Sequence, residues 1–109
     1  MSRAKGNEAE ELAKNYLYDH GFSIVEQNFY SRFGEIDIVA LKDEVLHFVE
    51  VKSGEDYEKA VQNITPTKLS RLIKTGDIYI KKNSIEIDYV YDAIIVVDQE
   101  ISYLENLTI

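Results

Sequence analysis

Apolar residues near the start of the chain recur at helical spacing. They lie three or four positions apart in one run: Ala9, Leu12, Ala13, Tyr16 and Leu17. Gly21 interrupts the pattern, and His20 just before it suits the carbonyl end of a helix dipole. The spacing predicts a helix over about residues 6–20.

Several later stretches show the alternation or the short apolar runs of β-strands. They cover residues 22–30, 35–41, 45–52 and 87–97, and a short last strand is predicted over 101–107. Residues 31–34 form a loop. The polar Lys42, Asp43 and Glu44 form a turn between the second and third strands, most simply a hairpin.

A second helix is predicted to begin at Pro66. Thr65 is a candidate N-cap, and Pro66 suits the first helical position. One face of this helix carries small and apolar residues, in which Gly76 allows close packing: Leu69, Leu72, Ile73, Gly76 and Ile80. Residues 54–63 form either a short helix or a mobile loop.

This order of elements predicts the fold class. A helix, three strands, a second helix and further strands indicate an α/β fold with helices on the faces of a mixed sheet. The length of 109 residues fits one domain spanning residues 1–109.

Composition removes several classes of chemistry. The chain has no Cys, which excludes a disulfide framework, a cysteine-ligated zinc site and thiol catalysis, and it has 2 His. The loop motifs GxxxxGK[ST] and GxGxxG and the nucleophile elbow GxSxG are missing from the sequence. His47 lies in an apolar strand and is interpreted as a structural residue.

The sequence also predicts a cytoplasmic protein that does not contact a membrane. Residues 1–11 are polar and lack the apolar core of a secretory signal. The longest uninterrupted apolar run, residues 93–97, is far shorter than the roughly 20 residues of a spanning helix.

Net charge of −8 argues against general affinity for nucleic acid, because that affinity comes mainly from Lys and Arg. The charge is unevenly distributed, however. Residues 86–109 contain acidic side chains and no Lys or Arg, whereas residues 66–82 are basic through Lys68, Arg71, Lys74, Lys81 and Lys82. The basic stretch is either a nucleic-acid contact or a solvated helix face.

Charged residues also interrupt the apolar faces of the second and third strands. Alternation places Ile36, Ile38 and Ala40 on one face of the second strand, and Glu35, Asp37, Val39 and Leu41 on the other. A two-residue turn at Asp43 and Glu44 pairs Lys42 with Val45. The same register sets Asp37 opposite Glu50, and Glu35 opposite Lys52.

Opposed carboxylates repel each other unless a positive group lies between them. One interpretation is an ion pair with Lys52. The other is a site for Mg²⁺ or Mn²⁺, because a chain without Cys and nearly without His offers only oxygen ligands. The residues alone leave both interpretations open.

Two strings in these strands resemble a known family. GEIDIVA at residues 34–40 and FVEVK at residues 48–52 are similar to the bacterial YraN family, whose endonuclease-like fold is related to archaeal Holliday junction resolvases and to PD-(D/E)XK nucleases. The likeness extends to further positions upstream and downstream: Gly6, Glu10, Ala13, Tyr16, Leu17, Gly21, Asn28, Thr65, Pro66, Lys68 and Asp92.

The resemblance implies a restriction-endonuclease-like αβββαβ core and a Mg²⁺- or Mn²⁺-dependent endonuclease. Asp37, Glu50 and the Val51 carbonyl would hold the metal, Lys52 would be the motif lysine, and Glu10 would be a further acidic member. The expected substrate is DNA, with branched and single-stranded forms as candidates, and a homodimer is an expected active form.

Other features bear on the DNA contacts. Lys68, Arg71 and Lys74 are the expected contacts on the second helix, and Tyr16, Tyr30 and Phe33 are candidates for stacking on bases or for packing. The acidic residues 55–56, and Tyr30 where the family commonly has a basic residue, remove expected phosphate contacts. A non-cleaving binding module and an interaction protein with structural carboxylates are the alternatives.

Overall fold

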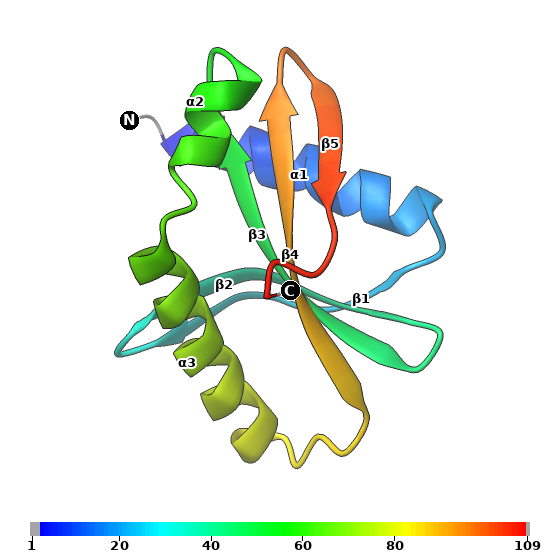
Figure 1. Cartoon of the computed structure of the whole chain (residues 1–109). Helices are drawn as coiled ribbons and strands as arrows, with labels where there is room; N and C mark the ends of the chain where they lie inside the picture. Colours follow the sequence, from blue (N-terminus) through cyan, green and yellow to red (C-terminus); the bar gives the residue numbers. More distant parts are fainter. Residues whose placement is uncertain (1–2, 109) are drawn as a thin grey trace.

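Helices and strands alternate along the chain in the computed structural model, which describes residues 3–108 and, for side chains, residues 8–108. The elements are α1 (Arg3–Asp19), β1 (Ser23–Ser31), β2 (Gly34–Lys42), β3 (Val45–Ser53), α2 (Tyr57–Gln62), α3 (Pro66–Lys82), β4 (Asp88–Val97) and β5 (Glu100–Leu104) (Figure 1).

The strands form one mixed sheet in the order β1-β2-β3-β4-β5. Neighbouring strands are antiparallel except β3 and β4, which are parallel. A parallel pair needs a long crossover, and α2 and α3 provide it. The sheet therefore consists of an antiparallel β1–β2–β3 meander and a β4–β5 hairpin, which one crossover connection joins.

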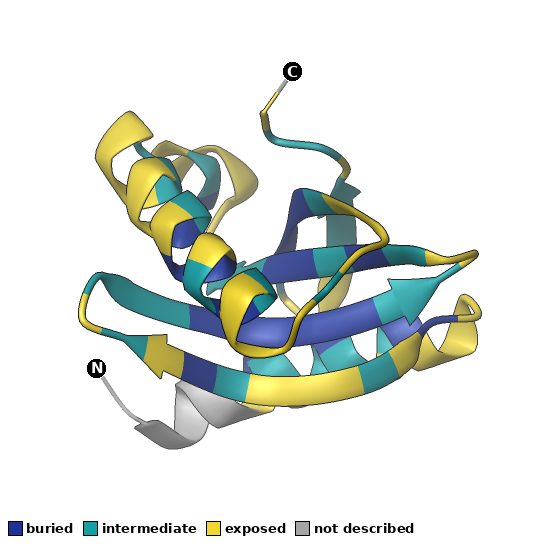
Figure 2. Cartoon of the chain, turned by 90° about the horizontal axis from the view of Figure 1, so that it is seen from below, coloured by how far each residue is buried: buried dark blue, intermediate teal, exposed yellow. Residues whose placement is uncertain are grey.

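Two apolar cores lie on opposite faces of this sheet. On one face α1 buries Ala13 and Leu17 against Ile38, Val49 and Ile94. On the other face α3 packs on a second cluster: Phe29, Ile36, Val39, Leu46, Phe48, Leu72, Tyr79 and Tyr91. Figure 2 shows the buried stretches of the strands between the helices. The chain thus forms a single compact α/β domain, as the pattern predicted.

Capping residues in the sequence predicted the start of α3 correctly, whereas the end of the last strand was predicted too late. Thr65 caps α3 by accepting a hydrogen bond from the Lys68 amide at 3.2 Å, and Pro66 begins the helix. Residues 54–63 contain the short helix α2, which is capped by Asp56. The last strand ends at Leu104 and not at residue 107, since the amide of Leu107 turns back to the carbonyl of Tyr91.

α1 begins at Arg3, earlier than residue 6, because its polar first turn shows no apolar periodicity in the sequence. Among the described residues, no helix has both the length and the apolar character needed to cross a bilayer.

Candidate metal and nucleic-acid site

A two-residue turn sets the register of β2 against β3. Asp43 and Glu44 both have positive φ, 50° and 64°, as in the hairpin turns that match strand twist. Lys42 pairs with Val45, and the paired positions run to Ile38 opposite Val49. The predicted register is confirmed over these positions, and the predicted pairs Asp37–Glu50 and Glu35–Lys52 lie beyond the last paired position.

The two faces of β2 exchange at Asp37. Ile38 packs in the α1 core, whereas Ile36 packs in the α3 core beside Phe29. The prediction that Ile36 and Ile38 share a face is therefore wrong. Asn28, which lies between the paired positions on β1, adopts a left-handed conformation with φ of 55°, and such a residue breaks the regular alternation of a strand pair.

Asp37 lies at this exchange point, and its carboxyl group reaches sideways to β3. Its Oδ2 accepts the backbone N–H of Val51 at 2.7 Å, and Asp37 is only 7% exposed. The Asp37 side chain thus accepts a hydrogen bond from β3 at a point beyond Ile38 and Val49, the last paired residues of β2 and β3. This contact places Asp37 beside Glu50, its neighbour in the predicted register.

Burial raises the pKa of Asp37 to about 9, with a hydrogen bond to the Glu50 carboxyl and the Glu50 charge as further causes. The Val51 amide acts in the opposite direction, and the charge of Glu10 raises the pKa further. Two carboxyl groups can hydrogen-bond to each other only if one carries a proton. In the absence of a cation, the Asp37 carboxyl group is therefore protonated at neutral pH.

Asn28 connects Glu10 on α1 with Glu35 on β2. Its Nδ2 donates to Glu10 Oε1 at 3.1 Å and to Glu35 Oε2 at 2.9 Å. In the sequence, Asn28 stands out only through the family resemblance, and nothing there predicts this bridging role. An Asn on one strand is a weak signal for contact with an acid on the next strand and another on a helix. Here the contact depends on the left-handed backbone of Asn28, which the sequence does not reveal.

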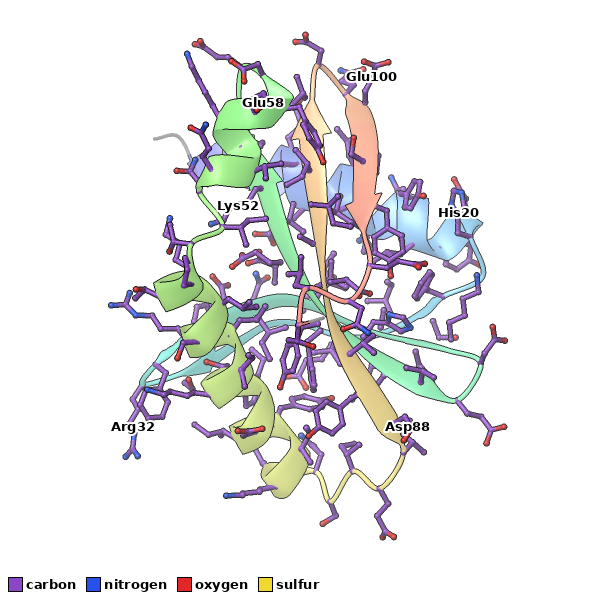
Figure 3. The ribbon with its side chains drawn as sticks, viewed as in Figure 1. His20, Arg32, Lys52, Glu58, Asp88 and Glu100 are labelled. Atoms are coloured by element: carbon purple, nitrogen blue, oxygen red, sulfur yellow. The ribbon has the colours of Figure 1, made fainter. Side chains whose placement is uncertain are left out.

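Lys52 lies next to Glu50 and not next to Asp37. Its Nζ is 3.9 Å from Glu50 Oε1, a long contact between partly exposed groups. A small groove of about 220 Å³ adjoins this pair and contains both acidic and basic side chains: Phe33, Gly34, Glu35, Glu50, Lys52, Lys68, Arg71 and Leu72. Figure 3 shows Lys52 on β3 beside α3.

Two more basic residues of this region, Arg32 of the β1–β2 hairpin tip and Lys74 of α3, meet at the ring of Phe33. Phe33 lies under Arg32 at 4.9 Å and Lys74 at 5.2 Å from its ring centroid. Thr75 of α3 hydrogen-bonds Ser31 at 2.8 Å and holds the tip against the helix. Tyr30 is exposed at the same end of β1, whereas Tyr16 lines a different groove, described below.

The donor set limits what cation could bind. Among residues 8–108, no group of three or more His, Cys, Asp or Glu side chains is arranged to hold a metal ion. Asp37, Glu50 and the backbone carbonyl of Val51 remain. One or two carboxylates with several waters is the usual environment of Mg²⁺, so these residues fit Mg²⁺ or Mn²⁺. Glu10 would act through Asn28.

The sequence of this chain matches the model of the "Uncharacterised protein family UPF0102" over residues 9–96. The chain belongs to UPF0102. This is the family that the two strings resemble under the name YraN, so the expected membership is confirmed.

Members of UPF0102 from other bacteria align along the whole domain. A UPF0102 protein of Sulfurimonas denitrificans is 65% identical over 109 residues, which is 100% of both chains. One from Wolinella succinogenes is 50% identical over 109 residues, again 100% of both. One from Helicobacter pylori strain HPAG1 is 50% identical over 106 residues, covering 97% of this chain and 92% of the relative.

Proposed function

We propose that this UPF0102 chain is a metal-dependent endonuclease that hydrolyses phosphodiester bonds in DNA. The observation that carries the proposal is the juxtaposition of Asp37, whose pKa is raised to about 9, with Glu50, Lys52 and a groove that Lys68 and Arg71 also line. The resemblance to PD-(D/E)XK nucleases in both strings supports it, as does an element order compatible with a restriction-endonuclease-like core.

The carboxyl pair is better suited to a cation than to an ion pair within the protein. Lys52 contacts Glu50 only at 3.9 Å, and Asp37 accepts the Val51 amide and has a pKa raised to about 9. A buried pair of acids without a close cationic partner is costly to the fold. Such a cost is typical of positions kept for function.

Mg²⁺ or Mn²⁺, when bound at Asp37 and Glu50, would polarise the phosphate and acidify a bound water. The Lys52 ammonium would orient that water or stabilise the negative charge that grows on the phosphate oxygens. Glu10 and Glu35, fixed by Asn28, would keep the acidic region in position. Hydrolysis forms one P–O bond to the water oxygen and breaks one ester bond to a sugar oxygen.

Lys68 and Arg71 supply the phosphate contacts in this proposal. Both are exposed on α3 and line the same groove as Glu50 and Lys52. Lys74 and Arg32 extend the positive charge to Phe33 at the hairpin tip. The ring of Phe33 offers a stacking surface for an unpaired base, which favours branched or single-stranded DNA as substrate.

A cleavage assay on several DNA forms tests the proposal. Linear duplex, single-stranded, flap and four-way-junction DNA are incubated with Mg²⁺, Mn²⁺ or EDTA. We expect cleavage of at least one form with metal, none in EDTA, and loss of cleavage in Asp37→Asn and Glu50→Gln. Asp88→Asn, an exposed acid at the start of β4, is the matched control and should cleave normally.

Two outcomes contradict the nuclease proposal. Metal-binding protein that cleaves no DNA form would be a binding module, an alternative that the net charge of −8 and the acidic residues 55–56 favour. If calorimetry with Mn²⁺ gives the same result for the wild type and for Asp37→Asn, the carboxylates are structural, and the chain is an interaction protein.

A further inference from the structure

A second groove, of about 490 Å³, lies on the α1 side of the sheet, away from Asp37 and Glu50. Tyr16 and His20 of α1, Phe22, His47 of β3, and Asp92 and Tyr103 are among its lining residues. Its volume is within the range of small-molecule sites. His47 and Glu50 are three positions apart on β3, so alternation directs their side chains to opposite faces.

Both histidines of the chain line this groove. His20 is exposed, and its Nδ1 is 2.7 Å from the carbonyl oxygen of Tyr16. A carbonyl can only accept, so Nδ1 of His20 carries the hydrogen. In the neutral ring, Nε2 is then an acceptor.

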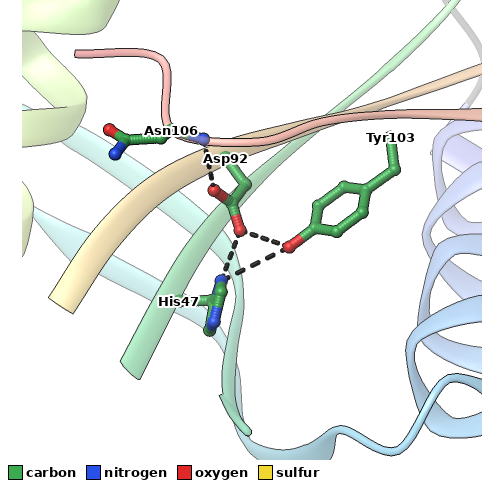
Figure 4. Close-up of polar contacts among 4 residues, drawn as sticks. All are labelled: His47, Asp92, Tyr103 and Asn106. Carbon is green, nitrogen blue, oxygen red and sulfur yellow. Dashed lines mark hydrogen bonds and ion pairs between the residues drawn. The ribbon is translucent and has the colours of Figure 1, made fainter. Parts of the chain in front are cut away.

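His47 is oriented in the same way by a buried carboxylate. Asp92 is 0% exposed, and its Oδ2 receives the Nδ1–H of His47 at 2.5 Å and the hydroxyl of Tyr103 (Figure 4). Its Oδ1 accepts the Asn106 amide at 2.8 Å. Burial and Asp92 raise the pKa of Tyr103, so its hydroxyl remains a donor.

The Nε2 atom of His47 is not fully buried. Every buried side-chain nitrogen or oxygen among the described residues has a hydrogen-bond partner, and the bonds of the His47 ring use Nδ1. The network therefore presents an oriented acceptor to the groove. A second acceptor of the same kind lies on His20.

Aromatic rings form the walls between these two acceptors. Tyr16 stacks on His20 with centroids 4.0 Å apart and meets the edge of Tyr103 at 6.1 Å. Phe22 meets His47 edge-on at 4.9 Å. A flat ring fits such walls, because aromatic groups gain from stacked and edge-to-face contacts.

Charges at the groove favour a neutral ligand. Asp43 and Glu105 line it and are exposed, whereas the cation present there, Lys42, already lies over the Phe22 ring at 5.1 Å. A phosphate would meet two carboxylates for one engaged ammonium. The aromatic walls, the histidine acceptors and the acidic side chains of the groove therefore all favour the same ligand. That ligand is a flat, uncharged ring with N–H donors at its edge.

We propose that this groove binds a nucleobase, as the free base or the nucleoside. The base packs against the rings of Tyr16 and Phe22, and an N–H group at its edge donates a hydrogen bond to Nε2 of His47. The site is independent of the proposed nuclease centre, since it lies on the other face of β3.

Titration of ¹⁵N-labelled protein with adenosine tests the site. We expect saturable shifts confined to the lining residues, including the Nε2 resonance of His47. N6,N6-dimethyladenosine, which lacks the exocyclic N–H donors, should bind at least about tenfold more weakly, the effect of losing one hydrogen bond. AMP should bind more weakly than adenosine, and ribose should give no shift.

Two variants separate the site from the fold. His47→Asn retains a donor near the Nδ1 position for Asp92 and removes Nε2, and Tyr16→Ala removes one wall. Each should weaken adenosine binding at least about tenfold, while Asp37→Asn should leave it unchanged. Adenosine shifts that do not saturate, or that persist equally in both variants, would overturn the proposal. Tighter binding of AMP would overturn the choice of a neutral ligand.

Discussion

Asp37 is the residue at which fold and proposed chemistry conflict. The Val51 amide holds its side chain in place, and Glu50 lies beside it, so folding brings two acids together in a site that water barely reaches. The raised pKa of Asp37 resolves this conflict, because the Asp37 carboxyl group keeps its proton at neutral pH. Any cation that binds there must displace that proton.

Asp37→Asn should stabilise the metal-free protein. The amide retains an acceptor for Val51 and a donor for Glu50 without requiring a bound proton, so the free energy of unfolding in EDTA at neutral pH should rise by about 1 kcal/mol or more. Chemical denaturation measures it. The control Asp88→Asn should change stability by less than about 0.5 kcal/mol. A loss of stability in Asp37→Asn would instead favour a structural ion pair.

The same substitution should flatten the pH dependence of stability. The folded-state pKa of Asp37, about 9, lies above its ordinary value of 3.8. Between these values the folded state holds a proton that the unfolded state has lost, so stability falls as pH rises through this window. The gap between Asp37→Asn and wild type should widen with pH, by up to about 1.4 kcal/mol per unit. Denaturation curves across the window check the sign.

Metal binding should release a proton. Below about pH 9 the proton of Asp37 must leave before a cation binds, so affinity for Mn²⁺ should rise by up to about tenfold per pH unit. Calorimetry in buffers of different ionisation enthalpy counts the released protons. A binding heat that is the same in all buffers would place the metal elsewhere.

At the scale of elements, the position of α3 on the sheet decides which basic residues reach the acids. Leu72 and Tyr79 anchor the helix in its core, and Thr75 ties it to the β1–β2 hairpin. Gly76 lets the helix approach Tyr91, whose ring stacks on Phe48 at 5.2 Å. This close approach holds Lys68 and Arg71 over the groove.

Gly76→Ala should destabilise the domain although alanine favours helices. The added Cβ would lie 2.7 Å from Cε1 and 2.9 Å from Cζ of the buried Tyr91 ring. We expect a loss of about 1–3 kcal/mol, larger than the gain of about 1 kcal/mol in helix propensity. Ser70→Ala, at an exposed position of the same helix, is the control for propensity. Equal stability of Gly76→Ala and wild type would contradict the tight contact.

At the scale of the whole molecule, DNA binding depends on where charge lies and not on its sum. The chain carries −8, and residues 86–109 are purely acidic among their charged side chains. The fold gathers Lys52, Lys68 and Arg71 around one groove, with Lys74 beside Phe33. If the proposed function holds, repulsion from the rest of the molecule makes DNA binding at this surface weak and salt-sensitive.

Changing Lys68, Arg71 and Lys74 together to Gln should lower DNA affinity and reduce the salt slope. Each lost phosphate contact lowers the magnitude of the slope of log K against log salt by about 0.9. The slope of the triple variant should therefore be smaller in magnitude by about 3. Changing Lys59, Lys81 and Lys82 to Gln alters the net charge equally and is the control. Fluorescence anisotropy over a salt series measures both. Equal effects of the two triple variants would mean that net charge, not α3, determines binding.

Local patterns in the sequence determined the elements and one register. Apolar spacing placed α1 and α3, Thr65 and Pro66 began α3, and the turn at Asp43 and Glu44 set the register of β2 against β3 from Lys42–Val45 to Ile38–Val49. These features depend on residues close together in the chain, so steric and hydrogen-bonding preferences of the backbone are sufficient to predict them. The two strings that resemble the family, GEIDIVA and FVEVK, contain Asp37 and Glu50 as well.

Tertiary structure alone decided the environment of those residues. The side on which Ile36 packs, the bridge from Asn28 to Glu10, and the contact of Asp37 with Val51 depend on strands that separate and twist. The hydrogen bond between His47 and Asp92 requires the parallel pairing of β3 with β4, which lie on either side of a long crossover. Burial and hydrogen bonds between residues distant in sequence arise only when the whole sheet closes, and sequence periodicity carries no information about them.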